Sequence, residues 1–245
     1  MLPLSPATVS KMLQRPTICF LPGLLCDESV WDAQSRALQD DADICVPRFL
    51  GLDSLPAMAE RTLAETSGPI WVAGHSMGGR VALEVWRLGA DRVAGLALLD
   101  TGVDAVQPGE ARGRLELVER SRKEGMDAVV QDWLPPMVHP SRHGEAAVME
   151  PMARMIGRAT PDQFEMQQRA LLNRPDATGY MANIRCPTAV IVGRQDLWSP
   201  VAQHEAIAAA IPGAVLTVIE DCGHMSPVER PDEVTAALRA WLGFG

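Results

Sequence analysis

The sequence predicts an α/β protein with a mainly parallel central sheet flanked by helices and one inserted helical cap. Short apolar runs alternate with helix-like segments, as in folds built from repeated strand–helix units. These runs are apolar almost throughout, which is typical of strands covered on both faces. The alternation stops near Val103 and resumes near residue 184. We therefore expect a core of residues 1–103 and 184–245, with residues 104–183 as the cap.

The first part of the core contains four apolar runs bounded by proline, glycine or charged residues. They predict strands at Thr17–Leu21, Asp43–Pro47, Pro69–Ala73 and Val93–Leu99. A helix is expected from about Ser29, whose side chain can cap it, and further helices are expected at 53–67 and 78–88.

The segment after Val103 has no clear strand pattern and reads as helical up to about Asn183. Proline residues interrupt it around position 135 and at position 140. Helices are expected at 110–124, 126–134, 146–156 and 161–172. More than half of the twelve methionines fall here, and methionine adapts well to irregular apolar surfaces. Two interpretations stay open: helices simply packed on a core, or a mobile cap over a pocket.

The strand–helix alternation then returns and continues to the end of the chain. Strands are expected at 187–193 and 214–219, with a helix at 200–211 between them. The last helix, at 230–242, has Pro231 near its start, where proline is favoured. The sequence therefore predicts one core interrupted by one insertion.

A G-x-S-x-G motif, Gly74-His-Ser-Met-Gly78, lies between a predicted strand and a predicted helix. In this setting a sharp turn exposes the central serine, and the flanking glycines leave room for the turn. Free N–H groups at the helix N-terminus favour a negatively charged oxygen. The motif therefore predicts Ser76 as a nucleophile, and the alternative is a glycine-rich turn with a capping serine.

A nucleophilic serine needs a base, and the base needs a carboxylate that orients it. His224 and Asp196 each follow a predicted strand, so both are expected at the carboxyl edge of the sheet, where Ser76 also lies. We therefore expect His224 to act as the base and Asp196 as its partner. Asp100 also follows a predicted strand and remains a rival acid.

Acyl transfer also requires N–H donors for the developing oxyanion. The N–H of Met77, directly after the serine, is one expected donor. The second is expected from the loop after the first strand, where Gly23 permits a close approach of the backbone. We expect the N–H of Leu24 to be this second donor.

Four blocks of sequence, taken together, resemble the α/β-hydrolase superfamily over nearly the whole chain. The blocks are Leu21-Pro-Gly-Leu-Leu25, Gly74-His-Ser-Met-Gly-Gly79, Val192-Gly-Arg-Gln-Asp196 and Cys222-Gly-His-Met-Ser-Pro227. The resemblance implies a mainly parallel sheet, a helical lid inserted after the fourth strand, and a serine mechanism without a cofactor. Small carboxylesterases and enol-lactone hydrolases are the most similar subfamilies. Pro22 stands where many relatives have a histidine that braces the oxyanion loop.

We therefore expect a serine hydrolase of a small carboxylic ester, thioester or lactone that works through an acyl-enzyme on Ser76. The resemblance implies that the same triad also serves C–C bond hydrolysis, acyl transfer, perhydrolysis and lyase chemistry, and these alternatives stay open. A ligand-binding or sensor protein on this scaffold is a further alternative.

Trp133, Trp198 and the methionine-rich cap helices are expected to form a mostly apolar roof over the substrate. The preferred acyl groups would then be apolar or weakly polar. Arginines of the cap offer an alternative, a site for a substrate carboxylate, although solvated helix faces are the simpler interpretation. These arginines are Arg112, Arg114, Arg154 and Arg158.

Composition excludes several other classes of protein. The chain has 245 residues, 47% of them hydrophobic, which argues against global disorder. The net charge of −9 argues against nucleic-acid binding. No apolar run of about 18 residues is present, so no membrane span is expected. The partner expected is a small-molecule substrate, and the oligomeric state stays open.

The N-terminus and the cysteines bear on location. The first fifteen residues contain Lys11 and Arg15 but no long apolar run, so we expect no secretory signal. Five scattered cysteines without CxxC spacing argue against a disulfide framework or a zinc site. We therefore expect a cytoplasmic protein without a metal.

Overall fold

The structure is a computed structural model that describes residues 15–244. The expected absence of a secretory signal concerns residues 1–14 and so lies outside the described residues. Across the described part of the chain, no helix is both long enough and apolar enough to span a bilayer. The five cysteines are all free in the structure.

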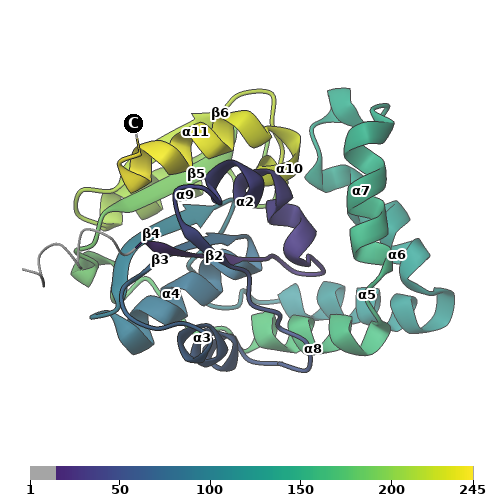
Figure 1. The fold of residues 1–245 in the computed structure, drawn as a ribbon. Coiled ribbons are helices and arrows are strands. Elements are labelled where there is room, and N and C mark those ends of the chain that lie inside the picture. The colour runs from purple at the N-terminus through teal and green to yellow at the C-terminus, as the bar shows by residue number, and fades with distance from the viewer. Residues whose placement is uncertain (1–14, 245) are drawn as a thin grey trace, which may run out of the picture.

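One six-stranded sheet runs through the centre of the molecule (Figure 1), with the strand order β2-β1-β3-β4-β5-β6. Every neighbouring pair of strands is parallel. The strands are β1 (Thr17–Leu21), β2 (Asp43–Cys45), β3 (Ile70–His75), β4 (Val93–Leu99), β5 (Thr188–Gly193) and β6 (Val215–Ile219). Parallel pairing brings the carboxyl ends of all the strands to one edge. The predicted α/β class is confirmed.

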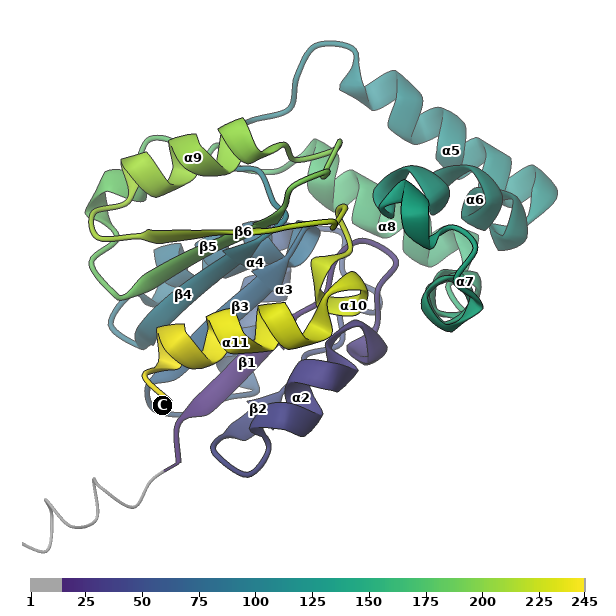
Figure 2. The same cartoon turned by 90° about the horizontal axis from the view of Figure 1, so that it is seen from above.

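Helices cover both faces of this sheet, which is why the central strands are almost wholly buried. Helices α2 (Asp32–Leu38) and α11 (Pro231–Leu242) pack together on one face, and α3 (Leu55–Ala64) and α4 (Met77–Gly89) pack on the other. Helix α9 (Val201–Ala210) covers β5 and β6 on the side opposite α11 (Figure 2). The short helix α10 (Ser226–Glu229), which the sequence did not predict, precedes α11.

The first helical segment begins differently from the prediction. A 3-10 turn, η1 (Glu28–Trp31), comes before α2, and the cap of this turn is Asp27 rather than Ser29. The Asp27 carboxylate accepts a hydrogen bond from the N–H of Ser29 at 3.0 Å. The predicted cap was wrong because a carboxylate two residues earlier satisfies this donor, while the Ser29 hydroxyl itself donates to the same carboxylate.

Between β4 and β5 the chain leaves the sheet and forms four helices, each within one residue of its predicted bounds. They are α5 (Glu110–Glu124), α6 (Met126–Trp133), α7 (Ala146–Gly157) and α8 (Pro161–Leu172). Three short 3-10 turns accompany them: η2 (Pro135–Met137), η3 (Pro140–Arg142) and η4 (Met181–Asn183). In both views the four helices lie together at one end of the sheet. We call residues 104–183 the cap.

Candidate active site

Ser76 occupies a strained turn between β3 and α4. Its backbone angles are φ 54 and ψ −116, in a region that non-glycine residues rarely adopt. The flanking glycines permit a close approach of backbone. An added Cβ would lie 2.1 Å from the Gly78 carbonyl oxygen at Gly74, and 2.0 Å from the Leu21 carbonyl oxygen at Gly78. Both glycines are therefore required by packing, as the motif predicts.

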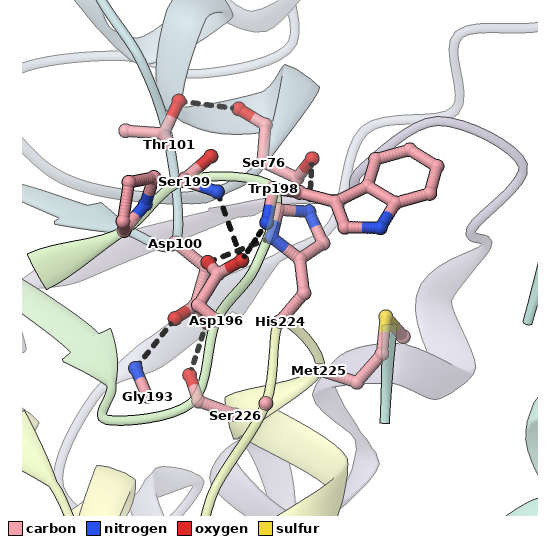
Figure 3. A network of polar contacts seen from close by, with 12 residues as sticks. Ser76, Asp100, Thr101, Gly193, Asp196, Trp198, Ser199, His224, Met225 and Ser226 are labelled. Carbon is pink, nitrogen blue, oxygen red and sulfur yellow. Dashed lines mark hydrogen bonds and ion pairs between the residues drawn. The ribbon is translucent and has the colours of Figure 1, made fainter. Parts of the chain in front are cut away.

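The three predicted triad residues lie in one hydrogen-bonded line (Figure 3). His224 Nε2 is 2.8 Å from Ser76 Oγ, and His224 Nδ1 is 2.8 Å from Asp196 Oδ2. The side chains of His224 and Asp196 are 5% and 0% exposed. These distances are within the reach needed for proton transfer from the hydroxyl to the imidazole.

The second carboxylate oxygen of Asp196 is also hydrogen-bonded. Its Oδ1 accepts hydrogen bonds from the N–H groups of Trp198 and Ser199, at 2.8 Å and 2.9 Å. Burial raises the pKa of Asp196, but the charge of His224 and these hydrogen bonds outweigh burial and lower it below its usual value. An ionised Asp196 therefore faces Nδ1 of His224 and favours the tautomer that leaves Nε2 free to accept a proton.

Asp100, the rival acid, faces a different set of partners. Its Oδ1 accepts from the N–H of Gly193 at 2.9 Å, and its Oδ2 accepts from the hydroxyl of Ser226. Burial, followed by the negative charge of Asp196, raises the pKa of Asp100 well above its usual value. Of the two predicted acids, the structure places Asp196 against His224.

Two hydrogen bonds to the backbone of His224 fix the loop that carries it. The N–H of His224 donates to the Met137 carbonyl oxygen in the cap, at 2.7 Å. The His224 carbonyl oxygen accepts from Nε2 of His75 at 2.7 Å. Burial, and then the neighbouring His224, lower the pKa of His75 to about 3, so His75 stays neutral at ordinary pH. The cap and the last residue of β3 therefore hold the backbone of His224 from both sides.

The two predicted oxyanion donors lie beside the serine. Leu24 and Met77 both line the pocket into which Ser76 opens. Within residues 15–244, neither of their N–H groups donates to another protein group. Leu25 has a positive φ of 59, and its N–H donates to Oε1 of buried Gln167 at 2.9 Å. A cap side chain, which sequence reasoning missed, therefore holds the loop that carries Leu24.

The pocket beside Ser76 has a volume of about 280 Å³ and a mixed lining. Trp133 and Trp198 both line it, as expected, and their rings meet edge to face with centroids 5.4 Å apart. Met77 of α4 is the single methionine among the described residues of the lining. The methionine-rich cap helices therefore do not form the mostly apolar roof that the sequence predicts. Cap methionines such as Met152 and Met155 are instead buried in the apolar core, where burial favours them most.

Charged side chains take the place of that apolar roof. The lining contains Arg80, Asp104, Glu110, Arg114 and Arg174. Sequence reasoning had considered only Arg114 of these five. The position of Arg80 in the sequence could have identified it as a pocket residue. Arg80 follows Ser76 by four positions, and residues four apart lie on one face of a helix.

The other cap arginines do not line this pocket. The side chains of Arg112 and Arg154 are 87% and 63% exposed, and the exposed Arg158 pairs with Asp27. The simpler interpretation, that these arginines lie on solvated helix faces, therefore applies to all three. Among residues 15–244, no group of three histidine, cysteine or acidic side chains is arranged to hold a metal ion.

The electrostatics of His224 give a testable pH dependence. Burial lowers the pKa of His224, but the charge and hydrogen bond of Asp196 outweigh burial and raise it above its usual value of about 6.5. Only a neutral imidazole can accept a proton from Ser76, so with His224 as the base we expect activity to fall as pH falls through this raised pKa. We expect kcat/KM for an ester, measured from about pH 5 to about pH 9, to rise with an apparent pKa above about 6.5. A profile that stays flat down to about pH 5 would contradict this assignment.

Comparisons with known proteins agree with this architecture. The model of a family described as "Alpha/beta hydrolase family" matches residues 20–237. A thermophilic esterase from Thermogutta terrifontis, solved with malate bound, is 31% identical, with a TM-score of 0.86 over 94% of this chain and 90% of that chain.

Two further relatives are more distant. The pimeloyl-[acyl-carrier protein] methyl ester esterase of Chromobacterium violaceum is 24% identical in an alignment of 206 residues that covers 82% of this chain and 79% of that protein. The enol-lactonase from Burkholderia xenovorans LB400 is 23% identical, with a TM-score of 0.84 over 95% of this chain and 93% of that chain, a likeness of fold. Since the family model extends from the first strand into the last helix, the chain belongs to the alpha/beta hydrolase family.

Proposed function

We propose that this protein is a serine hydrolase that cleaves a small carboxylic ester, thioester or lactone. The observation that carries the proposal is the line of two hydrogen bonds, each 2.8 Å, from Ser76 through His224 to Asp196. The esterase activity named for two relatives supports an ester as the substrate class. We also propose a cytoplasmic location, on the basis of the cysteine pattern.

The first half of the reaction forms an acyl-enzyme. His224 Nε2 removes the proton from Ser76 Oγ as this oxygen attacks the substrate carbonyl. The carbonyl oxygen becomes negative and accepts hydrogen bonds from the N–H groups of Leu24 and Met77. Each such donor is worth about 10²–10³-fold in rate in enzymes of this type. The protonated His224 then gives its proton to the leaving alcohol, thiol or alkoxide, and the acyl group remains on Ser76.

The second half of the reaction returns the enzyme to its starting state. A water molecule attacks the acyl carbon while His224 takes one of its protons. The oxyanion forms again between Leu24 and Met77, and it collapses with release of the acid. His224 returns the proton to Ser76 Oγ. Asp196 stabilises the imidazolium in both halves and is not itself protonated.

Covalent labelling tests the nucleophile independently of the natural substrate. We expect a fluorophosphonate probe to react in equal molar amount with the folded protein and to modify the peptide that contains Ser76, as read by mass spectrometry. Ser67→Ala, in an exposed loop remote from the pocket, is the matched control and should label normally. If the folded protein does not react with the probe, the proposal is contradicted and a ligand-binding role is favoured.

A second measurement is needed to identify the type of bond that the enzyme cleaves. We expect turnover of short p-nitrophenyl esters, thioesters or lactones, with a burst of the first product if deacylation is slow. A panel of diketones offered beside them examines C–C bond hydrolysis. If the probe labels Ser76 but the enzyme turns over only diketones, the assignment of the triad stands and the proposed substrate class is wrong.

A further inference from the structure

Arg80 is a cation in the pocket that lacks an ion-pair partner. It lies on α4, one helical turn after Ser76, and lines the same pocket. Its Nη1 donates to the Asp104 carbonyl oxygen at 2.9 Å. No carboxylate among residues 15–244 forms an ion pair with its guanidinium, although a guanidinium carries five N–H donors. Most of its hydrogen-bonding capacity is therefore left for something inside the pocket.

The other charged side chains of the lining already have hydrogen-bond partners. Glu110 accepts from Arg174 Nη2 at 2.7 Å and from Arg114 Nε at 2.8 Å. Burial raises the pKa of Glu110, but these hydrogen bonds outweigh burial and lower it to about 2. The Asp104 carboxylate accepts from the side-chain amide of Gln203 at 3.1 Å. Three guanidinium groups and two carboxylates thus line the pocket, and among them Arg80 is the guanidinium without an ion pair.

Arg80 remains charged despite its position. Burial, followed by the positive charge of Arg174, lowers its pKa to about 10, so the guanidinium is protonated at neutral pH. Arg80 is only partly buried, and a cation that has no ion-pair partner attracts an anion that enters the pocket. The pocket also favours an anionic ligand over a cationic one because its net charge is positive.

We propose that Arg80 binds a carboxylate of the substrate, and that the preferred substrates are esters carrying this carboxylate a few bonds from the reacting carbonyl. The planar fork of arginine matches a carboxylate with two parallel hydrogen bonds. This inference rests on the proposed function, because Ser76 sets the position of the carbonyl. A substrate with a carboxylate takes the place of the apolar or weakly polar acyl group that the sequence predicts.

The pocket limits the size of the substrate. Ser76 and Arg80 both line one pocket of about 280 Å³. Half-esters of five- and six-carbon dicarboxylic acids are small molecules that carry a carboxylate a few bonds from the reacting carbonyl. They are therefore suitable substrates for the test.

Gly102 gives the Arg80 guanidinium its space. A Cβ added at Gly102 would lie 2.6 Å from Arg80 Nη2 and 2.8 Å from Gln203 Nε2. Gly102→Ala therefore displaces the guanidinium without removing its charge. This variant tests the position of Arg80 separately from its charge.

The test compares kcat/KM for monomethyl glutarate and monomethyl adipate with kcat/KM for methyl pentanoate and methyl hexanoate. We expect the wild type to prefer the charged esters by at least about 10-fold. Arg80→Gln should lower kcat/KM for the charged esters by about 10- to 100-fold and change it for the neutral esters by less than about 3-fold. Added salt should weaken turnover of the charged esters alone.

Matched variants separate binding from a structural role. Arg112→Gln removes an exposed cap charge and should leave both classes of ester unaffected. Arg80→Lys keeps the charge but loses the fork, so it should fall between the wild type and Arg80→Gln. If Arg80→Gln fails to fold, as judged by its thermal melt, Arg80→Lys and Gly102→Ala still report the preference.

The outcomes distinguish this inference from the proposed function. A wild type that hydrolyses neutral esters at least as well as charged ones, with Arg80→Gln lowering both alike, would overturn the carboxylate site and leave the serine mechanism standing. A wild type that hydrolyses none of these esters and whose Ser76 resists a fluorophosphonate would overturn the proposed function, and this inference with it. 4-Acetoxybutyrate carries its carboxylate on the alcohol side, and an Arg80-dependent preference for it over butyl acetate would also support the inference.

Discussion

Ser76→Ala is expected to lower kcat/KM for the best ester by about 10⁴-fold or more, because it removes the attacking oxygen itself. The oxyanion donors and the pocket stay in place, so a small residual rate above that of water is expected. The measurement is steady-state hydrolysis of the same ester by the wild type and the variant. Each preparation should be freshly expressed so that no wild-type enzyme carries over.

The control for this loss is structural. Ser76→Ala removes a hydroxyl that points into the pocket and should retain the circular dichroism spectrum and the thermal melt of the wild type. Ser67→Ala should match the wild-type rate. Equal rates for Ser76→Ala and the wild type would remove Ser76 from the mechanism, whatever the geometry around it.

Asp196→Asn is expected to lower kcat by about 10⁴-fold, the size seen when a triad carboxylate becomes an amide. Oδ1 of Asp196 already accepts two backbone N–H bonds, so the amide oxygen of the asparagine will stay there. The NH₂ group then faces Nδ1 of His224, which must act as an acceptor and place its proton on Nε2. An imidazole in that tautomer cannot take the proton of Ser76.

Asp100→Asn is the matched comparison for this loss. Asp100 accepts from the N–H of Gly193 and from the hydroxyl of Ser226, and it is not hydrogen-bonded to His224. An asparagine can keep the first bond with its oxygen and donate to the Ser226 oxygen with its amide. We expect kcat within about 10-fold of the wild type. Equal losses in Asp196→Asn and Asp100→Asn would contradict the assignment of the acid.

Local sequence features were enough to predict most of the architecture. Helices α5 and α8 begin and end at the predicted residues. Gly109 and Gly125 flank α5, and Thr160 with Pro161 marks the start of α8. The central strands were recognisable because burial on both faces demands an unbroken apolar run. Ser76, Asp196 and His224 were recognisable because each lies directly after a predicted strand, and parallel strands bring such positions to one edge.

Packing decided what those local rules leave open. Asp100 and Asp196 both follow strands, and only the fold shows that one faces His224 while the other faces Gly193 and Ser226. Gln167 of the cap reaches the N–H of Leu25 across 142 positions of sequence, a contact that no local pattern announces.

The sequence by itself therefore determined the succession of strands and main helices along the chain and the edge at which the reactive side chains gather. The character of the pocket was decided only by the tertiary structure. Several cap methionines, Met152 and Met155 among them, are buried in the core, where burial of apolar surface is most favourable, and charged side chains lie around the serine. Arg80 became the unpaired cation of that pocket because Glu110 was already taken by two other arginines, a competition that exists only once distant segments pack together.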